Sequence, residues 1–265
     1  MLYFVATPIG NLKDISFRAI EVLGEVDEIA CEDTRHSLQL LSHYGIKKPL
    51  FSYHKYNERE VGEKIIEKLK NGANIAVISD AGTPLISDPG NILVSLLIEN
   101  GLEFTVIPGA CALINALVLS GLDSSRFCFL GFLPEKQGER QELLDKYKDL
   151  DLTLIFYCAP HNIKKDLETL YSVFGERRAV AVKEISKLYE RAVRFNLKDG
   201  LGEDPKGEFV LVVEKSERVS PLLSLTEKEH IDYYINLGLD KKEALKKVAK
   251  ERGIAKSLLY KYTVD

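Results

Sequence analysis

One stretch of the chain decides the fold class, namely Ile75-Ala76-Val77-Ile78-Ser79-Asp80-Ala81-Gly82-Thr83-Pro84-Leu85-Ile86-Ser87-Asp88-Pro89-Gly90. Its first four residues form an apolar run, which is typical of a buried parallel strand. A second apolar run, over residues 92–98, predicts a helix. In open parallel sheets, ligands bind at the loops that leave the carboxyl ends of the strands. We therefore expect residues 79–90 to form a ligand-binding loop.

This loop is stiff, small and acidic. Pro84 and Pro89 fix their own φ angles, and Gly82 and Gly90 accept backbone angles that other residues avoid. The loop contains two aspartates and neither lysine nor arginine. It is therefore a poor cradle for phosphate, and it suits hydroxyl groups or a cationic ligand better.

The two aspartates of the loop have different predicted roles. Asp88 precedes Pro89, and this order is typical of a helix N-cap followed by the first helical residue. We interpret Asp88 as the cap of the following helix. Asp80 lies at the end of the strand, where a cap is less needed, so it is the better candidate for ligand contact.

The rest of the chain predicts two α/β domains and a helical tail. Apolar strand-like runs alternate with helical stretches through residues 1–118, which indicates a parallel sheet covered on both faces. A second α/β domain is predicted over residues 119–216, where the alternation at 189–197 indicates an antiparallel strand and hence a mixed sheet. Residues 217–265 are predicted to form a small, helix-turn-helix-like tail.

The predicted tail differs in charge from the rest of the chain. The net charge of the 265 residues is -4, yet residues 241–265 contain eight basic and three acidic residues, which gives +5. Thr226 with Glu229 is typical of a capping box, as is Asn57 with Glu60 earlier in the chain. A basic helical unit suggests an anionic partner, but small helical units also cap neighbouring domains, and the sequence leaves both open.

Composition excludes several classes of protein. With 45% hydrophobic and 29% charged residues, the chain is neither disordered nor fibrous. Its cysteines are isolated, which indicates reduced thiols and no zinc site; they are Cys31, Cys111, Cys128 and Cys158. No basic leader or apolar run of roughly 20 residues is present. We therefore expect a cytoplasmic protein with no membrane partner and no bound metal.

Glycines and charged residues gather at predicted strand ends. The chain has no G-x-G-x-x-G after its first strand and no Walker sequence. Glycines and prolines recur instead in three strand-end turns, which would build one shared pocket: Pro8/Gly10, Gly82/Gly90 and Pro108/Gly109. Lys183 and Glu184 end a later strand, with Lys187 close behind. This group is either a proton-handling site or a salt bridge.

Several motifs together resemble one known family. They are Val5-Ala6-Thr7-Pro8-Ile9-Gly10-Asn11-Leu12, Cys31-Glu32-Asp33-Thr34-Arg35-His36, the loop 79–90, Pro108-Gly109-Ala110-Cys111-Ala112-Leu113, Gly131-Phe132-Leu133-Pro134, Ile155-Phe156-Tyr157 and Lys206-Gly207-Glu208. The chain is similar over nearly its whole length to the ribosomal RNA small subunit methyltransferase I family of the tetrapyrrole methylase superfamily. It departs from that family's pattern at Cys158 and Asn162, where a Glu and an Arg are usual, which suggests a shifted local ion pair.

The resemblance implies a fold, a cofactor and an acceptor. The fold would be two α/β domains with the cofactor in the cleft between them, in a homodimer. The cofactor would be S-adenosylmethionine, and the acceptor the 2′-hydroxyl of a cytidine in the decoding region of 16S ribosomal RNA, within the small ribosomal subunit. The residues implied to line the cofactor pocket are Pro8, Asp80, Gly82, Thr83, Ile86, Ser87, Ala112, Leu113, Tyr157 and Glu208.

A methyl acceptor hydroxyl is weakly acidic and needs a base or a charge to activate it. We predict that Glu184, tuned by Lys183 and Lys187, contributes to that step. Two other functions stay open. One is a tetrapyrrole or other small-molecule methylase of the same superfamily, which would leave the basic tail unexplained. The other is a non-catalytic nucleotide-binding or RNA-binding module.

Overall fold

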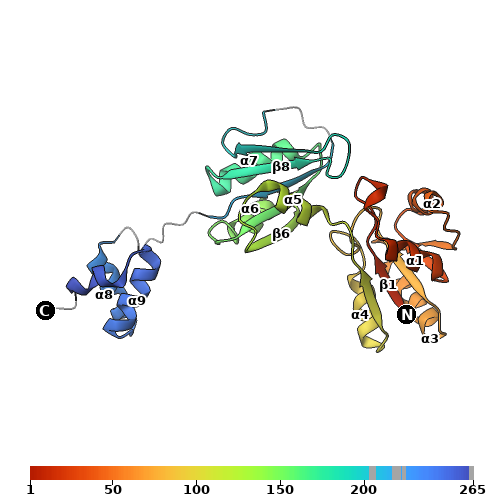
Figure 1. Cartoon of the computed structure of the whole chain (residues 1–265), viewed down its shortest axis with the longest axis horizontal. Coiled ribbons are helices and arrows are strands. Elements are labelled where there is room, and N and C mark those ends of the chain that lie inside the picture. Colours follow the sequence, from red (N-terminus) through yellow and green to blue (C-terminus); the bar gives the residue numbers. More distant parts are fainter. Residues whose placement is uncertain (203–206, 217–221, 223–224, 263–265) are drawn as a thin grey trace. The chain divides into compact units, whose positions relative to one another are not determined.

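The computed structural model describes residues 1–202, 207–216, 222 and 225–262 (Figure 1). The chain divides into two compact units. The first comprises Met1–Lys148 and Leu152–Lys215, and the second comprises Asp149–Asp151 and Ser216–Asp265. The first unit contains two five-stranded sheets, which we call the first sheet and the second sheet.

The first sheet is entirely parallel, as predicted. Its strand order is β3-β2-β4-β1-β5. The strands are β1 (Leu2–Val5), β2 (Glu28–Cys31), β3 (Leu50–Ser52), β4 (Ile75–Ile78) and β5 (Phe104–Ile107). All four residues of β4 are buried, because this strand lies inside the sheet and has helices on both faces.

Helices cover the two faces of the first sheet. Alternate strand residues such as Ile75 and Val77 pack with one pair of helices, α3 (Glu58–Lys70) and α4 (Asn91–Glu99). The intervening Ala76 and Ile78 pack with the other pair, α1 (Phe17–Glu25) and α2 (Thr34–His43). A short 3-10 helix, η1 (Leu12–Asp14), lies between β1 and α1.

The second sheet is mixed, which confirms the prediction of antiparallel strands late in the chain. Its order is β6-β7-β10-β8-β9, with only β6 and β7 parallel neighbours. The strands are β6 (Phe127–Phe132), β7 (Thr153–Cys158), β8 (Arg178–Lys183), β9 (Arg191–Asn196) and β10 (Phe209–Val213). One face packs on α6 (Gln137–Asp145) and α7 (Ile163–Phe174), and the other on α5 (Ala112–Ser120).

A buried ion pair joins the two helices on the first of these faces. Arg140 of α6 and Asp166 of α7 lie 2.7 Å apart, and both side chains are almost fully buried. The Arg140 guanidinium also donates to the carbonyl oxygen of Pro134. Cys158 stands beside Asp166, and burial raises the pKa of its thiol. An ion pair therefore occupies the neighbourhood in which the departure at Cys158 suggested one.

The caps of α4 and α3 differ from the predictions. Its N-cap is Gly90, with no side-chain cap from within the loop, so the interpretation of Asp88 as the cap is wrong. The buried carboxylate of Glu58 instead accepts hydrogen bonds from the backbone N–H groups of Gly90 (2.8 Å) and Ile92 (3.0 Å). Asn57 is the N-cap residue of α3, as predicted, but its side chain makes no cap bond and accepts instead from the backbone N–H of His54 (2.8 Å), so the predicted pairing with Glu60 is wrong.

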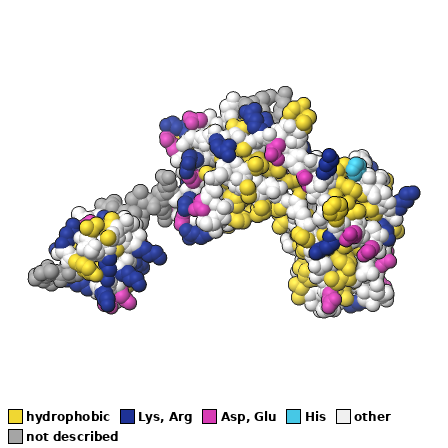
Figure 2. All heavy atoms as spheres, in the orientation of Figure 1, with side chains coloured by type: hydrophobic (Ala, Val, Ile, Leu, Met, Phe, Trp, Pro, Cys, Tyr) yellow, Lys and Arg dark blue, Asp and Glu magenta, His cyan; other side chains and the backbone are white. Residues whose placement is uncertain are grey.

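The second unit has its own small core. Its helices are α8 (Glu227–Asn236), α9 (Lys241–Arg252) and η3 (Lys256–Tyr262). The predicted capping box of Thr226 and Glu229 is present. Buried residues such as Tyr234, Leu245 and Leu259 hold the three helices together. Figure 2 shows lysine and arginine side chains over much of the visible face of this unit.

Candidate functional site

Three turns meet at the carboxyl edge of the first sheet. Thr7, after β1, exchanges backbone hydrogen bonds with Gly82, after β4 (2.9 and 3.1 Å). The Thr83 hydroxyl donates to the carbonyl oxygen of Ala110, after β5 (3.1 Å). Parallel strands all end at the same edge, so turns far apart in sequence become neighbours. The three turns come together, as predicted, but their prolines and glycines do not line one shared pocket: Gly82 lines one hollow, and Pro8 and Gly10 line its neighbour.

The loop 79–90 has an unusual backbone. Besides Gly82 and Gly90, two residues with side chains have positive φ angles, Leu85 at 72° and Ser87 at 69°. A bulky residue in this region costs conformational energy and persists only where the surroundings hold it. A Cβ atom on Gly90 would lie 2.6 Å from the Leu85 side chain, so the loop is closed tightly upon itself.

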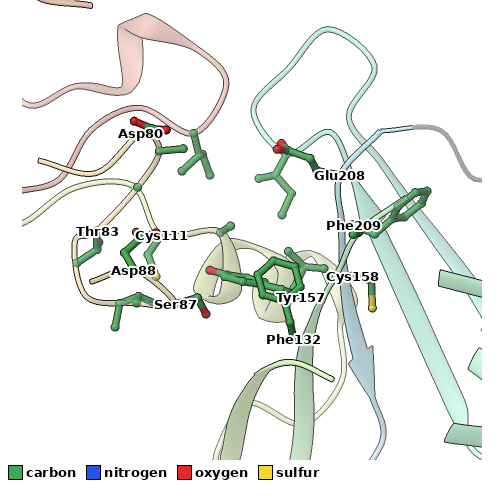
Figure 3. Close-up of a pocket in the computed structure, with 18 of the residues that line it drawn as sticks. Asp80, Thr83, Ser87, Asp88, Cys111, Phe132, Tyr157, Cys158, Glu208 and Phe209 are labelled. Carbon is green, nitrogen blue, oxygen red and sulfur yellow. The ribbon is translucent and has the colours of Figure 1, made fainter. Parts of the chain in front are cut away.

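A cavity of about 440 Å³ opens between this loop and one edge of the second sheet. Such a volume is typical of small-molecule sites. Figure 3 shows Asp80, Thr83 and Asp88 on one side of it and Glu208 and Phe209 on the other. The lining residues are Ile9, Glu32, Asp80, Ala81, Gly82, Thr83, Ile86, Ser87, Asp88, Cys111, Ala112, Phe132, Tyr157, Cys158, Ala159, Pro160, Ile185, Glu208, Phe209 and Val210.

The structure brings together most of the residues predicted for a cofactor pocket. The cavity is lined by Asp80, Gly82, Thr83, Ile86, Ser87, Ala112, Tyr157 and Glu208. Pro8 lies instead in a neighbouring groove. Leu113 is buried in the core between α5 and the second sheet, and its side chain does not line the cavity. Their contact with a cofactor stays a prediction.

The sequence interpretation missed other lining residues. Asp88 was interpreted as a helix cap, and Glu32 stood in a noted motif, residues 31–36, without a role. Phe132 stood in a noted motif, Gly131-Phe132-Leu133-Pro134, without a role. Phe209 and Val210 begin β10, and nothing in the sequence marked them as cavity-lining residues. An apolar strand residue gives the same pattern whether it faces a core or a cavity.

One end of the cavity is acidic. Burial, then the nearby carboxylates of Glu32 and Asp80, raises the pKa of Asp88 to about 6, although a hydrogen bond with Ser79 works in the opposite direction. Burial and Asp80 also raise the pKa of Glu32. Among the described residues that line the cavity, none is lysine or arginine. This end therefore favours a ligand that carries positive charge and disfavours phosphate.

The opposite wall is aromatic and apolar. The ring of Tyr157 meets the rings of Phe129 and Phe132 at centroid distances of 4.7 and 5.5 Å, both edge-on. Burial raises the pKa of the Tyr157 phenol to about 12, so this group is a neutral hydroxyl near neutral pH. The wall can therefore hold a flat apolar ring and offer a hydroxyl beside it.

The predicted catalytic group lies at the edge of this site. Glu184 does not line the cavity; its carboxylate accepts from the Glu208 backbone N–H (3.0 Å) and from Lys187 (3.2 Å). The first of these bonds contributes most to lowering the pKa of Glu184, which weakens it as a base. Lys187 also pairs with Glu208 (2.9 Å). Lys183, the last residue of β8, is not among the residues that line either hollow.

Contacts from the loop between β8 and β9, residues 184–190, hold the two sheets together. Glu184 and Ser186 both have positive φ angles, 52° and 67°. The Ser186 hydroxyl donates to Asp14, after β1. A Cβ atom on Gly10 would lie 2.6 Å from the Lys187 side chain and 2.8 Å from the Ile185 carbonyl oxygen. Glycine is therefore required at residue 10 for the close approach of the two segments.

Comparison with known proteins agrees with this architecture. Residues 1–200 match the family model of Tetrapyrrole (Corrin/Porphyrin) Methylases. Among solved structures, the methyltransferase CobJ is similar with a TM-score of 0.63 and 18% identity, covering 83% of this chain and 97% of that one. Diphthine synthase also has a TM-score of 0.63 and 18% identity, covering 81% and 90%. These two likenesses concern the fold alone.

Relatives of higher sequence identity identify the family within the tetrapyrrole methylases. A protein of Haemophilus influenzae named ribosomal RNA small subunit methyltransferase I is 47% identical over 99% of this chain and 95% of its own length. The protein of the same name in Halalkalibacterium halodurans is 43% identical over 98% and 93%. The chain belongs to the ribosomal RNA small subunit methyltransferase I family of the tetrapyrrole methylases, and it is a methyltransferase.

The described residues contain neither a membrane-spanning helix nor a metal-binding cluster. No helix among them is both long enough and apolar enough to cross a membrane. In the same part of the chain, no three His, Cys, Asp or Glu side chains are grouped so that they could hold a metal ion. All four cysteines are free, as predicted.

Proposed function

We propose that the protein transfers the methyl group of S-adenosylmethionine to the 2′-hydroxyl of a cytidine in the decoding region of 16S ribosomal RNA. The observation that carries the proposal is the cavity, which is acidic at one end, aromatic along one wall, and free of lysine and arginine among its described lining residues. This donor bears an ammonium and a sulfonium and has no phosphate.

The cavity residues fit the donor group by group. Asp80, Asp88 and Glu32 would lie toward its ammonium and sulfonium groups, with its carboxylate turned away from them. Phe132 and Tyr157 would pack against its adenine ring. The backbone of the loop residues that line the cavity, Gly82, Thr83, Ile86 and Ser87, would supply hydrogen bonds to its polar edges. A stiff loop holds these groups in place before binding, which reduces the entropy lost on binding.

Methyl transfer depends mainly on positioning. When bound, S-adenosylmethionine supplies a methyl carbon on sulfur, and an in-line displacement breaks that bond as the acceptor oxygen bonds to carbon. The hydroxyl proton must leave to a base. Glu184, supported by Lys183 and Lys187, stays our prediction for this role. Normal single-turnover methylation by Glu184→Gln would reject it and would leave Glu184 as a positioning residue for Glu208.

The acceptor assignment is supported by the relatives, whose names state ribosomal RNA of the small subunit. The basic stretch 241–265 of the second unit suits an RNA partner, because each lysine or arginine contact to phosphate adds affinity and salt dependence. Removal of residues 226–265 should then weaken RNA binding and flatten its salt dependence. On this proposal the protein works in the cytoplasm on the small ribosomal subunit, as a homodimer.

A single comparison of acceptors tests the function. Methyl-labelled S-adenosylmethionine is offered with small ribosomal subunits, with naked 16S ribosomal RNA and with a tetrapyrrole precursor. We expect label only in the RNA, at a 2′-O-methylcytidine identified by mass spectrometry after nuclease digestion. Label in the tetrapyrrole, or in an RNA base, would contradict the proposal. Binding of the donor with no transfer to any acceptor would favour a non-catalytic module.

A further inference from the structure

A second hollow adjoins the donor cavity. This groove has a volume of about 350 Å³. It shares four lining residues with the cavity, so the two spaces meet along them: Ile9, Asp80, Ala81 and Glu208. The other residues that line the groove are Thr7, Pro8, Gly10, Leu12, His36, Gln39, Leu40 and Lys187. A methyl acceptor must reach the donor, and the groove is positioned to hold one.

The groove has an apolar side and a polar side. Pro8, Leu12 and Leu40 present apolar surface. The polar side comes from α2, where the exposed amide of Gln39 forms no hydrogen bond with any residue that the structure describes. An amide both donates and accepts, so it can pair with the edge of a nucleobase.

His36 stands where the groove meets the cavity. Its Nε2 lies 3.2 Å from the carbonyl oxygen of Asp80. A carbonyl oxygen only accepts, so Nε2 carries the hydrogen, and the imidazole is held in one orientation over the loop. His36 therefore gives the boundary a fixed polar group, close to the loop proposed for the donor.

The charge at this boundary selects among acceptors. Lys187 is paired with both Glu184 and Glu208, so its charge is already matched. Asp80 and Glu208 add carboxylates to the same region. A phosphate or the carboxylate side chains of a tetrapyrrole would meet repulsion here. A sugar hydroxyl would instead find acceptor oxygens.

We propose that this groove binds the acceptor nucleoside, with the base between the apolar side and Gln39 and the ribose toward Asp80 and Glu208. The inference rests on the proposed function and adds the place and the recognition of the acceptor. Gln39 becomes a specificity-determining residue for the base, and Leu12 a wall against which the base packs. A groove that ends at the donor cavity brings a ribose hydroxyl to the methyl group without moving either sheet.

Two substitutions and two matched controls test the groove. Gln39→Ala removes the amide, and Leu12→Trp fills the groove from a side chain that is 40% exposed and so tolerates enlargement. Gln141→Ala on α6 and Leu38→Trp on α2 are equivalent changes at exposed residues that line neither hollow. Affinity for S-adenosylmethionine is measured by calorimetry, and methylation of unmethylated small subunits by initial rates.

The expected results separate donor from acceptor. All four variants should bind S-adenosylmethionine within about twofold of the unsubstituted protein, which also reports that they are folded. Gln39→Ala should raise KM for the subunit roughly fivefold, the loss of about one hydrogen bond. Leu12→Trp should lower kcat/KM at least roughly 50-fold, because the base no longer fits. The controls should match the unsubstituted protein.

Two failures are distinguishable. If the unsubstituted protein methylates the RNA while Gln39→Ala and Leu12→Trp behave like their controls, the acceptor lies elsewhere and this inference is overturned alone. If the unsubstituted protein binds the donor and places no methyl group on the RNA, the proposed function fails and the inference fails with it. A loss of donor affinity confined to Gln39→Ala or Leu12→Trp would also overturn it, because the groove would then belong to the donor site.

Discussion

The two sheets of the first unit contribute to the cavity in different ways. The first sheet supplies loop residues that follow its strands, and these are mostly small or acidic, such as Gly82 and Asp88. The second sheet supplies residues of the strands themselves or next to them, and these are mostly apolar, such as Phe132 and Tyr157.

The difference follows from strand direction. In the first sheet every strand ends at the same edge, so loops gather there. In the second sheet β6, β7 and β8 end at the edge where β10 begins, because β10 is antiparallel to β7 and β8. The described cavity-lining residues at that edge lie at the ends of these strands or directly beside them, such as Tyr157 and Phe209. A parallel sheet thus supplies polar recognition, and the mixed sheet supplies a firm wall.

The largest expected effect on stability concerns the buried ion pair between α6 and α7, which pack on one face of the second sheet. Asp166→Ala leaves the buried guanidinium of Arg140 without its partner, which should cost about 3–5 kcal/mol of unfolding free energy. Urea denaturation measures the loss. Asp145→Ala, which removes an exposed pair with Lys148, should change stability by less than about 1 kcal/mol. An equal effect of both changes would show that the buried pair is not what holds α6 against α7.

Glu58 should matter next most, because it fixes the end of the loop of the first sheet. Glu58→Ala removes the acceptor of two backbone N–H groups and of the Tyr53 hydroxyl, which should cost about 2–3 kcal/mol. Donor affinity should fall with it, since the loop 79–90 loses its anchor. Glu63→Ala, exposed on the same helix, serves as the control for stability and calorimetry. Unchanged donor affinity in Glu58→Ala would show that the Glu58 cap does not hold the loop 79–90 in its binding conformation.

The junction between the sheets should be sensitive to a single methyl group. Gly10→Ala places a Cβ against the Ile185 carbonyl oxygen, which should cost about 2 kcal/mol and weaken donor binding. Gly24→Ala is a matched change inside α1 with open space around it, and it should stabilise by roughly 0.5 kcal/mol. Thermal unfolding with and without S-adenosylmethionine checks both. Tolerance of Gly10→Ala would mean that the two sheets can separate there without consequence.

The smallest expected effect concerns Asp88 and pH. Its folded pKa of about 6 lies above the unfolded value, so the folded protein holds this proton more tightly. The resulting penalty on stability is absent near pH 4, grows as the pH rises to about 6, and is then constant. Asp88→Asn should therefore stabilise the ligand-free protein at pH 7.5 by about 1 kcal/mol, after allowance for partial exposure, and by nothing near pH 4.

Urea denaturation of Asp88→Asn at several pH values measures this effect. Asp232→Asn on the exposed face of α8 is the control and should give a curve parallel to the unsubstituted protein. The same Asp88→Asn change should weaken binding of the cationic donor. Stabilisation that persists at pH 4, or stronger donor binding, would contradict the assignment of Asp88 to the acidic end of the cavity.

Local pattern was enough for much of the fold. The apolar run at 75–78 identified a central parallel strand, because a strand that is buried on both faces is apolar throughout and shows no alternation with polar residues. The alternation at 189–197 indicated β9, and Thr226 with Glu229 indicated the start of α8. Motifs at three strand ends also located half of the described residues that line one cavity.

Local pattern failed where the partner of a residue lies far away in sequence. Asp88 followed by proline looks like a cap, yet α4 is capped by Glu58, 32 residues earlier, and this frees Asp88 for the cavity. A nearby competitor has the same effect at Asn57, which stands at the N-cap of α3 as predicted but whose amide bonds back to residues 52 and 54 instead of to the helix.

Contiguous residues are enough to define the strands, the stiff loop, the family motifs and the acidic character of the loop, because each of these is a local property of the chain. Only the tertiary structure decided which carboxylate caps a helix and which faces a ligand. It also decided that α5 packs on the second sheet, and that a second groove meets the cavity at Asp80 and Glu208. These depend on the order and direction of strands, which bring distant residues together.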